Sequence, residues 1–150
     1  MGFSKLVLGY NFPNLEAIQP HLEPTASGPS TQWALATARR LNCLVVVGYP
    51  EVALEPSSLP SNVYSCSVFA PDHAGLIKSG ANHNSAVTVA PTGNIVAHYR
   101  KSFLYLTDAT WAIEGPGFHA GSLPLRMNEL AEPLLPVTMG VCMDINPYNC

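Results

Sequence analysis

The chain has 150 residues, enough for one ordinary domain with a core and too few for two. Charged residues make up only 11% of it, hydrophobic residues make up 47%, and the formal net charge is −3. The acidic balance and the lack of a basic run disfavour a nucleic-acid partner. No apolar run reaches the roughly 18 residues that a membrane-spanning helix needs, and no secretion signal opens the chain. We therefore expect a cytoplasmic protein with no membrane partner.

The low charged content has two explanations, because soluble domains usually contain about 25% charged residues. One is a sheet that is buried on both faces. The other is a fragment whose apolar faces are covered by further chain or by a partner. The composition leaves both explanations open.

The first half of the chain predicts a strand, a helix and a second strand. The first strand is expected at residues 6–8, almost at the start of the sequence. A helix is expected to begin at Pro29 and Ser30, because apolar residues then recur at helical spacing up to Leu41. The apolar run at residues 44–47, a leucine and three β-branched valines, is continuous, which is typical of a strand inside a sheet that is buried on both faces.

The second half predicts a hairpin, a long loop and a final strand. Serine and proline first mark a loop at residues 56–61. Two short β-like runs then flank the turn residues 91–94, which predicts a hairpin. Residues 107–125 are rich in glycine, proline and aromatic residues and are expected to form a structured loop. The last strand is expected at residues 134–141, and the whole order indicates an α+β or layered α/β fold.

Cys142 stands at the point where the last apolar run turns polar. It could be a packed thiol, half of a disulfide, a metal ligand or a nucleophile. Four scattered cysteines without a secretion signal disfavour a disulfide scaffold, and no paired-ligand spacing favours a metal site. Spacing alone leaves open an inert packed thiol and a nucleophile whose thiolate is stabilised by backbone N–H groups and a nearby cation.

Two further residues are candidates for chemistry. Lys101 follows the hairpin, so its ammonium is expected at the same edge of the sheet as Cys142; a solvated pair with Arg100 is the alternative. Glu114 stands between Trp111 and Phe118, whose rings could raise the pKa of its carboxyl enough for proton transfer. The alternative for Glu114 is a loop cap.

Three motifs together carry a resemblance to a known family. They are, in chain order, "HYRKSFLY", "DATWAIEGPGF" and "GVCMDINPY". This series resembles the carbon-nitrogen hydrolase (nitrilase) superfamily, and most closely its fungal branch of protein N-terminal amidases. The likeness extends to residues 8–43 and 45–51 and leaves out the interval of about 65–83.

The resemblance implies a layered α-β-β-α sandwich with a Glu-Lys-Cys triad and neither a metal nor an organic cofactor. Cys142 would attack the side-chain amide of an N-terminal Asn or Gln, release ammonia and form a thioester. Lys101 would stabilise the oxyanion together with the backbone N–H after the nucleophile, and Glu114 would position the lysine or assist hydrolysis. Asp144 would pair with the substrate's α-ammonium; a turn-forming aspartate is its alternative.

The resemblance further implies that the substrate is a protein or peptide marked for degradation by its new N-terminal Asp or Glu. A homo-oligomer is compatible with full-length relatives. Three functions stay open at this point: an active amidase of this type, an inactive or peptide-binding remnant, and a nitrilase-branch amidase for small amides or nitriles.

The sequence departs from the family pattern at the general base. The family's glutamate lies five residues before the Gly-Tyr segment, and counting back from Gly9 gives Ser4. A serine hydroxyl cannot replace a carboxylate that accepts a thiol proton near neutral pH. Glu51 and Glu55 are near in sequence, but nothing places either of them at that position.

The whole chain, residues 1–150, is expected to be one partial domain that is incomplete at both ends. The interval of about 65–83 interrupts a segment that is continuous in the family. Our hypothesis is that it derives from unspliced intron sequence. A transcript that lacks these codons is the expected observation.

Overall fold

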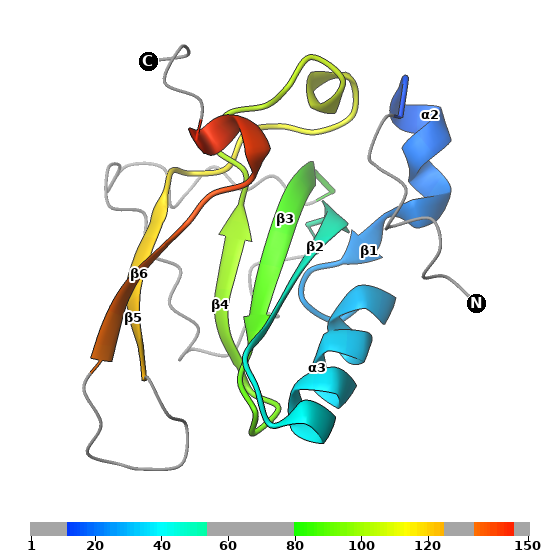
Figure 1. Cartoon of the computed structure of the whole chain (residues 1–150). Coiled ribbons are helices and arrows are strands. Elements are labelled where there is room, and N and C mark those ends of the chain that lie inside the picture. Colours follow the sequence, from blue (N-terminus) through cyan, green and yellow to red (C-terminus); the bar gives the residue numbers. More distant parts are fainter. Residues whose placement is uncertain (1–11, 54–79, 125–133, 146–150) are drawn as a thin grey trace.

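A computed structural model describes residues 12–53, 80–124 and 134–145 (Figure 1). The strands are β1 (Glu23–Pro24), β2 (Val45–Val52), β3 (Asn82–Val89), β4 (Ile95–Arg100), β5 (His119–Pro124) and β6 (Leu134–Met139). The α-helices are α2 (Leu15–Ile18) and α3 (Pro29–Leu41). The 3-10 turns are η1 (Gln19–His21), η3 (Asp108–Thr110) and η4 (Cys142–Ile145).

The larger sheet has the strand order β1-β2-β3-β4. β1 runs parallel to β2, whereas β2, β3 and β4 are antiparallel neighbours. The β3–β4 turn is closed by hydrogen bonds from Ala90 N to Asn94 O (2.9 Å) and from Gly93 N to Ala90 O (2.8 Å). Gly93 has a φ of +82°, a conformation that glycine adopts without strain. The predicted hairpin is confirmed.

Helix α3 packs against one face of this sheet, as Figure 1 shows. It begins at Pro29, where proline fits the first helical turn, and ends at Leu41; the next residue, Asn42, caps it in the left-handed conformation, with φ +50°. Its buried alanines, Ala34 and Ala38, lie in one core cluster with Val87. The predicted helix is confirmed, although Leu41 at its end is exposed.

Strand β2 differs from its prediction in exposure. The sequence predicts that the run at 44–47 is buried on both faces, but the Val46 side chain is 62% exposed. Burial on both faces begins only at Tyr49. In the described part of the chain, the first half of β2 is covered on one face only, where Val45 and Val47 pack against the α3 cluster.

β5 and β6 form a separate antiparallel pair, with His119 opposite Met139. The Thr88 hydroxyl contacts the Met139 sulfur at 3.7 Å, which places β6 next to β3. Figure 1 shows the pair on the side of the sheet opposite α3, so the described elements form α, β and β layers. The predicted last strand is confirmed for 134–139. The loop prediction for 107–125 is wrong at its end, where β5 lies.

Several predictions concern residues outside the described part of the chain. These are the strand at 6–8, the loop at 56–61, Ser4 and Glu55. Residues 65–79 of the interval ascribed to an intron also lie outside it. The end of that interval is described: Asn82 and His83 are in β3, opposite Val52 and Glu51.

Candidate active site

The candidate residues gather at the end of the sheet where β4 stops. Lys101 follows the last residue of β4, and Cys142 begins η4 shortly after β6. Figure 1 shows the loop after β4 and the η4 turn next to each other at this end of the molecule. The fold therefore brings together segments that lie about 40 residues apart, as a packed antiparallel fold allows.

Asp144 joins these two segments. Its Oδ1 accepts hydrogen bonds from the backbone N–H groups of Ser102 (3.1 Å) and Phe103 (2.7 Å). Its Oδ2 accepts from the Tyr99 hydroxyl (2.7 Å) and from Val141 N (2.8 Å). One carboxylate thus binds Tyr99, two residues before Lys101, the two residues after Lys101, and the residue just before Cys142.

The Tyr99 hydroxyl is a donor in this arrangement. Burial, and then the neighbouring Asp144 carboxylate, raises the pKa of Tyr99, so the phenol stays protonated at neutral pH. Four internal donors occupy the Asp144 carboxylate. These four hydrogen bonds agree with the alternative role of Asp144 as a turn-forming residue. Its contact with the α-ammonium of a substrate stays a prediction.

Lys101 is buried, with 2% of its surface exposed. Its Nζ lies 2.5 Å from Oδ2 of Asp108, which is buried as well. The same carboxylate oxygen accepts a hydrogen bond from Tyr105 N at 3.3 Å. The solvated pair of Lys101 with Arg100 is therefore not formed; the ammonium is held inside the protein by an acidic residue.

Glu114 lies in a loop whose backbone is fixed beside Lys101. Gly115 N donates to Lys101 O at 2.8 Å, and Ile113 N donates to Asn82 O at 2.9 Å. A Cβ at position 115 would lie 2.3 Å from the Arg100 carbonyl oxygen, so this close approach requires glycine. The Glu114 side chain itself is exposed, and the expected enclosure between Trp111 and Phe118 is not observed.

Cys142 carries an exposed free thiol, as Cys43 does. The reading of Cys142 as a packed core thiol is therefore wrong. Its φ is +53°, which is uncommon for a residue with a Cβ and costs about 1–3 kcal/mol of backbone strain. Residues 12–53, 80–124 and 134–145 contain no group of three or more His, Cys, Asp or Glu residues arranged to hold a metal ion.

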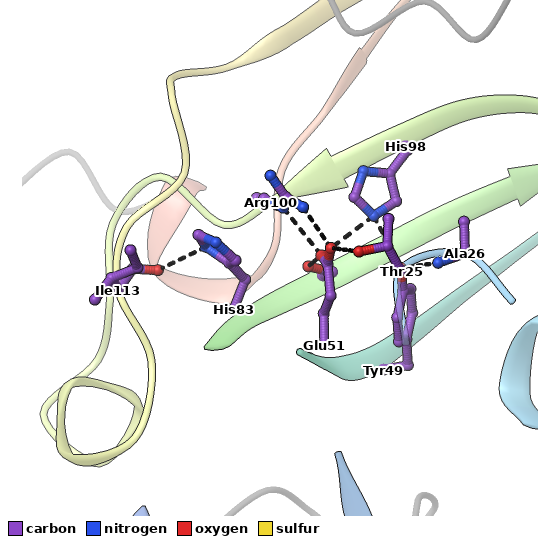
Figure 2. Close-up of polar contacts among 9 residues, drawn as sticks. Thr25, Ala26, Tyr49, Glu51, His83, His98, Arg100 and Ile113 are labelled. Atoms are coloured by element: carbon purple, nitrogen blue, oxygen red, sulfur yellow. Dashed lines mark hydrogen bonds and ion pairs between the residues drawn. The ribbon is translucent and has the colours of Figure 1, made fainter. Parts of the chain in front are cut away.

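A second polar cluster is formed by buried side chains of β2, β3 and β4 (Figure 2). Glu51 is fully buried and accepts hydrogen bonds from Thr25 (2.5 Å), Ser85 (2.5 Å) and both Nε (3.0 Å) and Nη2 (2.5 Å) of Arg100. His98 Nε2 lies 3.3 Å from the same carboxylate. These contacts join β2, β3 and β4.

Glu51 is held as a carboxylate by this cluster. Burial alone raises the pKa of Glu51, but hydrogen bonds from His98 and Arg100 and the charges of both lower it far below its usual range. Its oxygens are occupied by donors from the sheet, which indicates a structural role.

Sequence reasoning missed Asp108. It stands seven residues after Lys101 in a stretch without periodicity, so no local pattern marks it. Its significance depends on the loop that turns it back toward the lysine.

Comparison with known proteins gives consistent findings. A family model described as carbon-nitrogen hydrolase matches residues 6–146. The chain is 35% identical over 143 residues to the protein N-terminal amidase of Schizosaccharomyces pombe, and 27% identical over 151 residues to that of Saccharomyces cerevisiae. Each alignment covers 94% of this chain, but the chain spans only 40% and 28% of the lengths of these relatives.

Solved structures show the same likeness. A crystal structure of N-terminal amidase with a Gln-Gly peptide superimposes with a TM-score of 0.68 at 27% identity, covering 93% of this chain and 29% of that one. A structure of N-terminal amidase with an Asn-Glu peptide gives a TM-score of 0.68 at 26% identity, covering 94% and 30%. The expected α+β, nitrilase-like fold is confirmed. None of the helices described in this chain is long and apolar enough to cross a membrane.

Proposed function

The chain belongs to the carbon-nitrogen hydrolase family, and on this premise we propose that it carries the nucleophile of an amidohydrolase that deamidates N-terminal Asn and Gln. The substrate is a peptide or protein, and the products are ammonia and an N-terminal Asp or Glu. The observation that carries the proposal is the Asp144 carboxylate, because it binds the segment of Lys101 and the segment of Cys142 at once.

The reaction has two steps. The Cys142 thiol gives up its proton, its sulfur attacks the side-chain amide carbon, the C–N bond breaks, and that proton leaves with the nitrogen as ammonia. The resulting thioester is hydrolysed by water, which forms the carboxylate product and returns the thiol. Lys101 stabilises the negative oxygen that forms in each step, and Glu114 assists the attack of water.

Features of Cys142 and Lys101 support these roles. The Cys142 thiol is exposed and can reach a substrate, and its strained backbone is typical of functional sites, where surrounding structure enforces such conformations. The Lys101 ammonium is shielded from water, which strengthens its interaction with a developing charge.

We place this activity in the cytoplasm, as a step that prepares proteins for degradation through their N-terminal residue. The crystal structures of N-terminal amidase with Gln-Gly and Asn-Glu peptides support the choice of substrate, because this chain resembles that protein over most of its own length. The proposed substrates therefore begin with Asn or Gln and need a free N-terminus.

Ammonia release tests the proposal. The purified full chain is incubated with Asn-Glu, Gln-Gly, free asparagine and a simple nitrile. We expect ammonia from the peptides and none after Cys142→Ala. Cys43→Ala is the matched control, since Cys43 is also exposed and free, and it should retain wild-type activity.

Three other outcomes contradict the proposal in different ways. Peptide binding without ammonia indicates an inactive remnant. Preference for free asparagine or the nitrile indicates an enzyme for small amides or nitriles. Equal loss of activity in Cys43→Ala and Cys142→Ala refutes the assignment of the nucleophile.

A further inference from the structure

Lys101 and Asp108 form a buried ion pair in the site, and the proposed mechanism gives a role to Lys101 alone. Both side chains are almost fully buried, and their charged atoms are 2.5 Å apart. A buried ammonium without a counter-charge is strongly disfavoured, and the Asp108 carboxylate supplies that counter-charge for Lys101. Asp108 is the acidic residue that the structure places in contact with Nζ.

Asp108 is itself held rigidly. Its carbonyl oxygen accepts hydrogen bonds from Trp111 N (3.0 Å) and Ala112 N (2.8 Å), which close the η3 turn. Trp111 and Ala112 are buried in a core cluster with Ile18. The carboxylate also accepts a hydrogen bond from Tyr105 N, so both the backbone and the side chain of Asp108 are fixed relative to the core.

We propose that Asp108 is a positioning residue for the deamidation reaction, which holds the Lys101 ammonium fixed where the oxyanion forms. This inference rests on the proposed function, because it assigns Asp108 a role through Lys101. A lysine side chain has many rotamers, and a fixed ion pair selects one of them before the substrate arrives. Stabilising groups contribute most to catalysis when they are already in place as charge develops.

The proposal predicts a particular kinetic pattern. The ammonium interacts with negative charge that exists in the transition state and hardly at all in the bound amide. Loss of its alignment should therefore lower kcat and leave KM nearly unchanged. A residue that merely supports the fold would lower the amount of active protein or disturb substrate binding as well.

Asp108→Asn is the first test, with ammonia release from Asn-Glu as the readout. The amide keeps the size of the side chain and can still accept the bond from Tyr105 N, but it has no charge. We expect kcat to fall by about tenfold to a hundredfold, and KM to stay within about twofold. Glu16→Gln, which removes an exposed acidic charge from α2, is the matched control and should match the wild type.

Asp108→Glu is the second test. If circular dichroism shows that Asp108→Asn is unfolded, the result for Asp108→Glu decides the proposal. This substitution keeps the charge but moves the carboxylate by one methylene, so kcat should fall by about fivefold, less than in Asp108→Asn, again at constant KM. Wild-type kcat in either folded variant, or a change in KM alone, overturns the proposal for Asp108. If the wild type releases ammonia and Cys142→Ala does not, the proposed function stands whatever the Asp108 variants show.

Discussion

Glu51→Gln is expected to destabilise the protein more than an ordinary substitution. The change keeps the shape of the side chain and removes its charge. The Arg100 guanidinium, which is only 8% exposed, then loses its counter-charge. Removing one partner of a buried ion pair costs about 3–5 kcal/mol, because the other charge stays buried and uncompensated.

The hydrogen bonds of Arg100 add to this cost. Its Nε and Nη2 donate to different oxygens of Glu51, so the amide group of a glutamine faces one of these nitrogens with its own N–H. A buried donor without an acceptor costs about 1–3 kcal/mol. The total, about 4–8 kcal/mol, is comparable to the 5–15 kcal/mol by which whole domains are stable.

Urea unfolding at pH 7, followed by circular dichroism, measures the effect. Glu16→Gln is the control and should change the free energy of unfolding by less than about 0.5 kcal/mol, because Glu16 is exposed. The double variant Glu51→Gln/Arg100→Met should recover at least half of the loss, since no unpaired charge is left inside. A loss of less than about 1 kcal/mol in Glu51→Gln would refute the reasoning.

Three further predictions concern residues near the end of the larger sheet where β4 stops. Burial, and then the Arg100 charge, lowers the pKa of His83 to about 4, so the unfolded chain binds its proton first as the pH falls. The free energy of unfolding should therefore fall by about 2–3 kcal/mol between pH 6.5 and 4, and His83→Asn should reduce this slope in urea titrations at several pH values. Gly115→Ala should lower both kcat and the midpoint temperature of thermal unfolding, because the alanine Cβ would lie 2.3 Å from the Arg100 carbonyl oxygen. A variant with the wild-type kcat and midpoint temperature would contradict this. Asp144→Asn should cost about 2–3 kcal/mol in urea unfolding, since its amide N–H groups face backbone donors, and an equally stable variant would show that the carboxylate is dispensable.

The sequence predicts those elements that depend on local pattern. Helix α3 has helical spacing and a proline at its first turn, and the β3–β4 hairpin has turn residues between two β-like runs. Both are observed where they were expected. The last strand is found too, because an apolar run ends there at a polar turn.

Elements that depend on tertiary contacts could not be predicted in this way. β5 contains glycine and proline, and pairing with β6 rather than propensity makes it a strand. The same holds for the site. Position along the chain places Lys101 and Cys142 at one end of the sheet, whereas the partner of Lys101 depends on how the loop after β4 folds back.

The Asp144 carboxylate also sets an order of assembly. Its donors at Tyr99, Ser102 and Phe103 leave the ribosome some 40 residues earlier than their acceptor, and chains fold from the N-terminus as they are made. Until residue 144 emerges, these three donors lack their carboxylate acceptor. The segments that carry Cys142 and Lys101 are thus joined only after all four strands of the larger sheet have been synthesised.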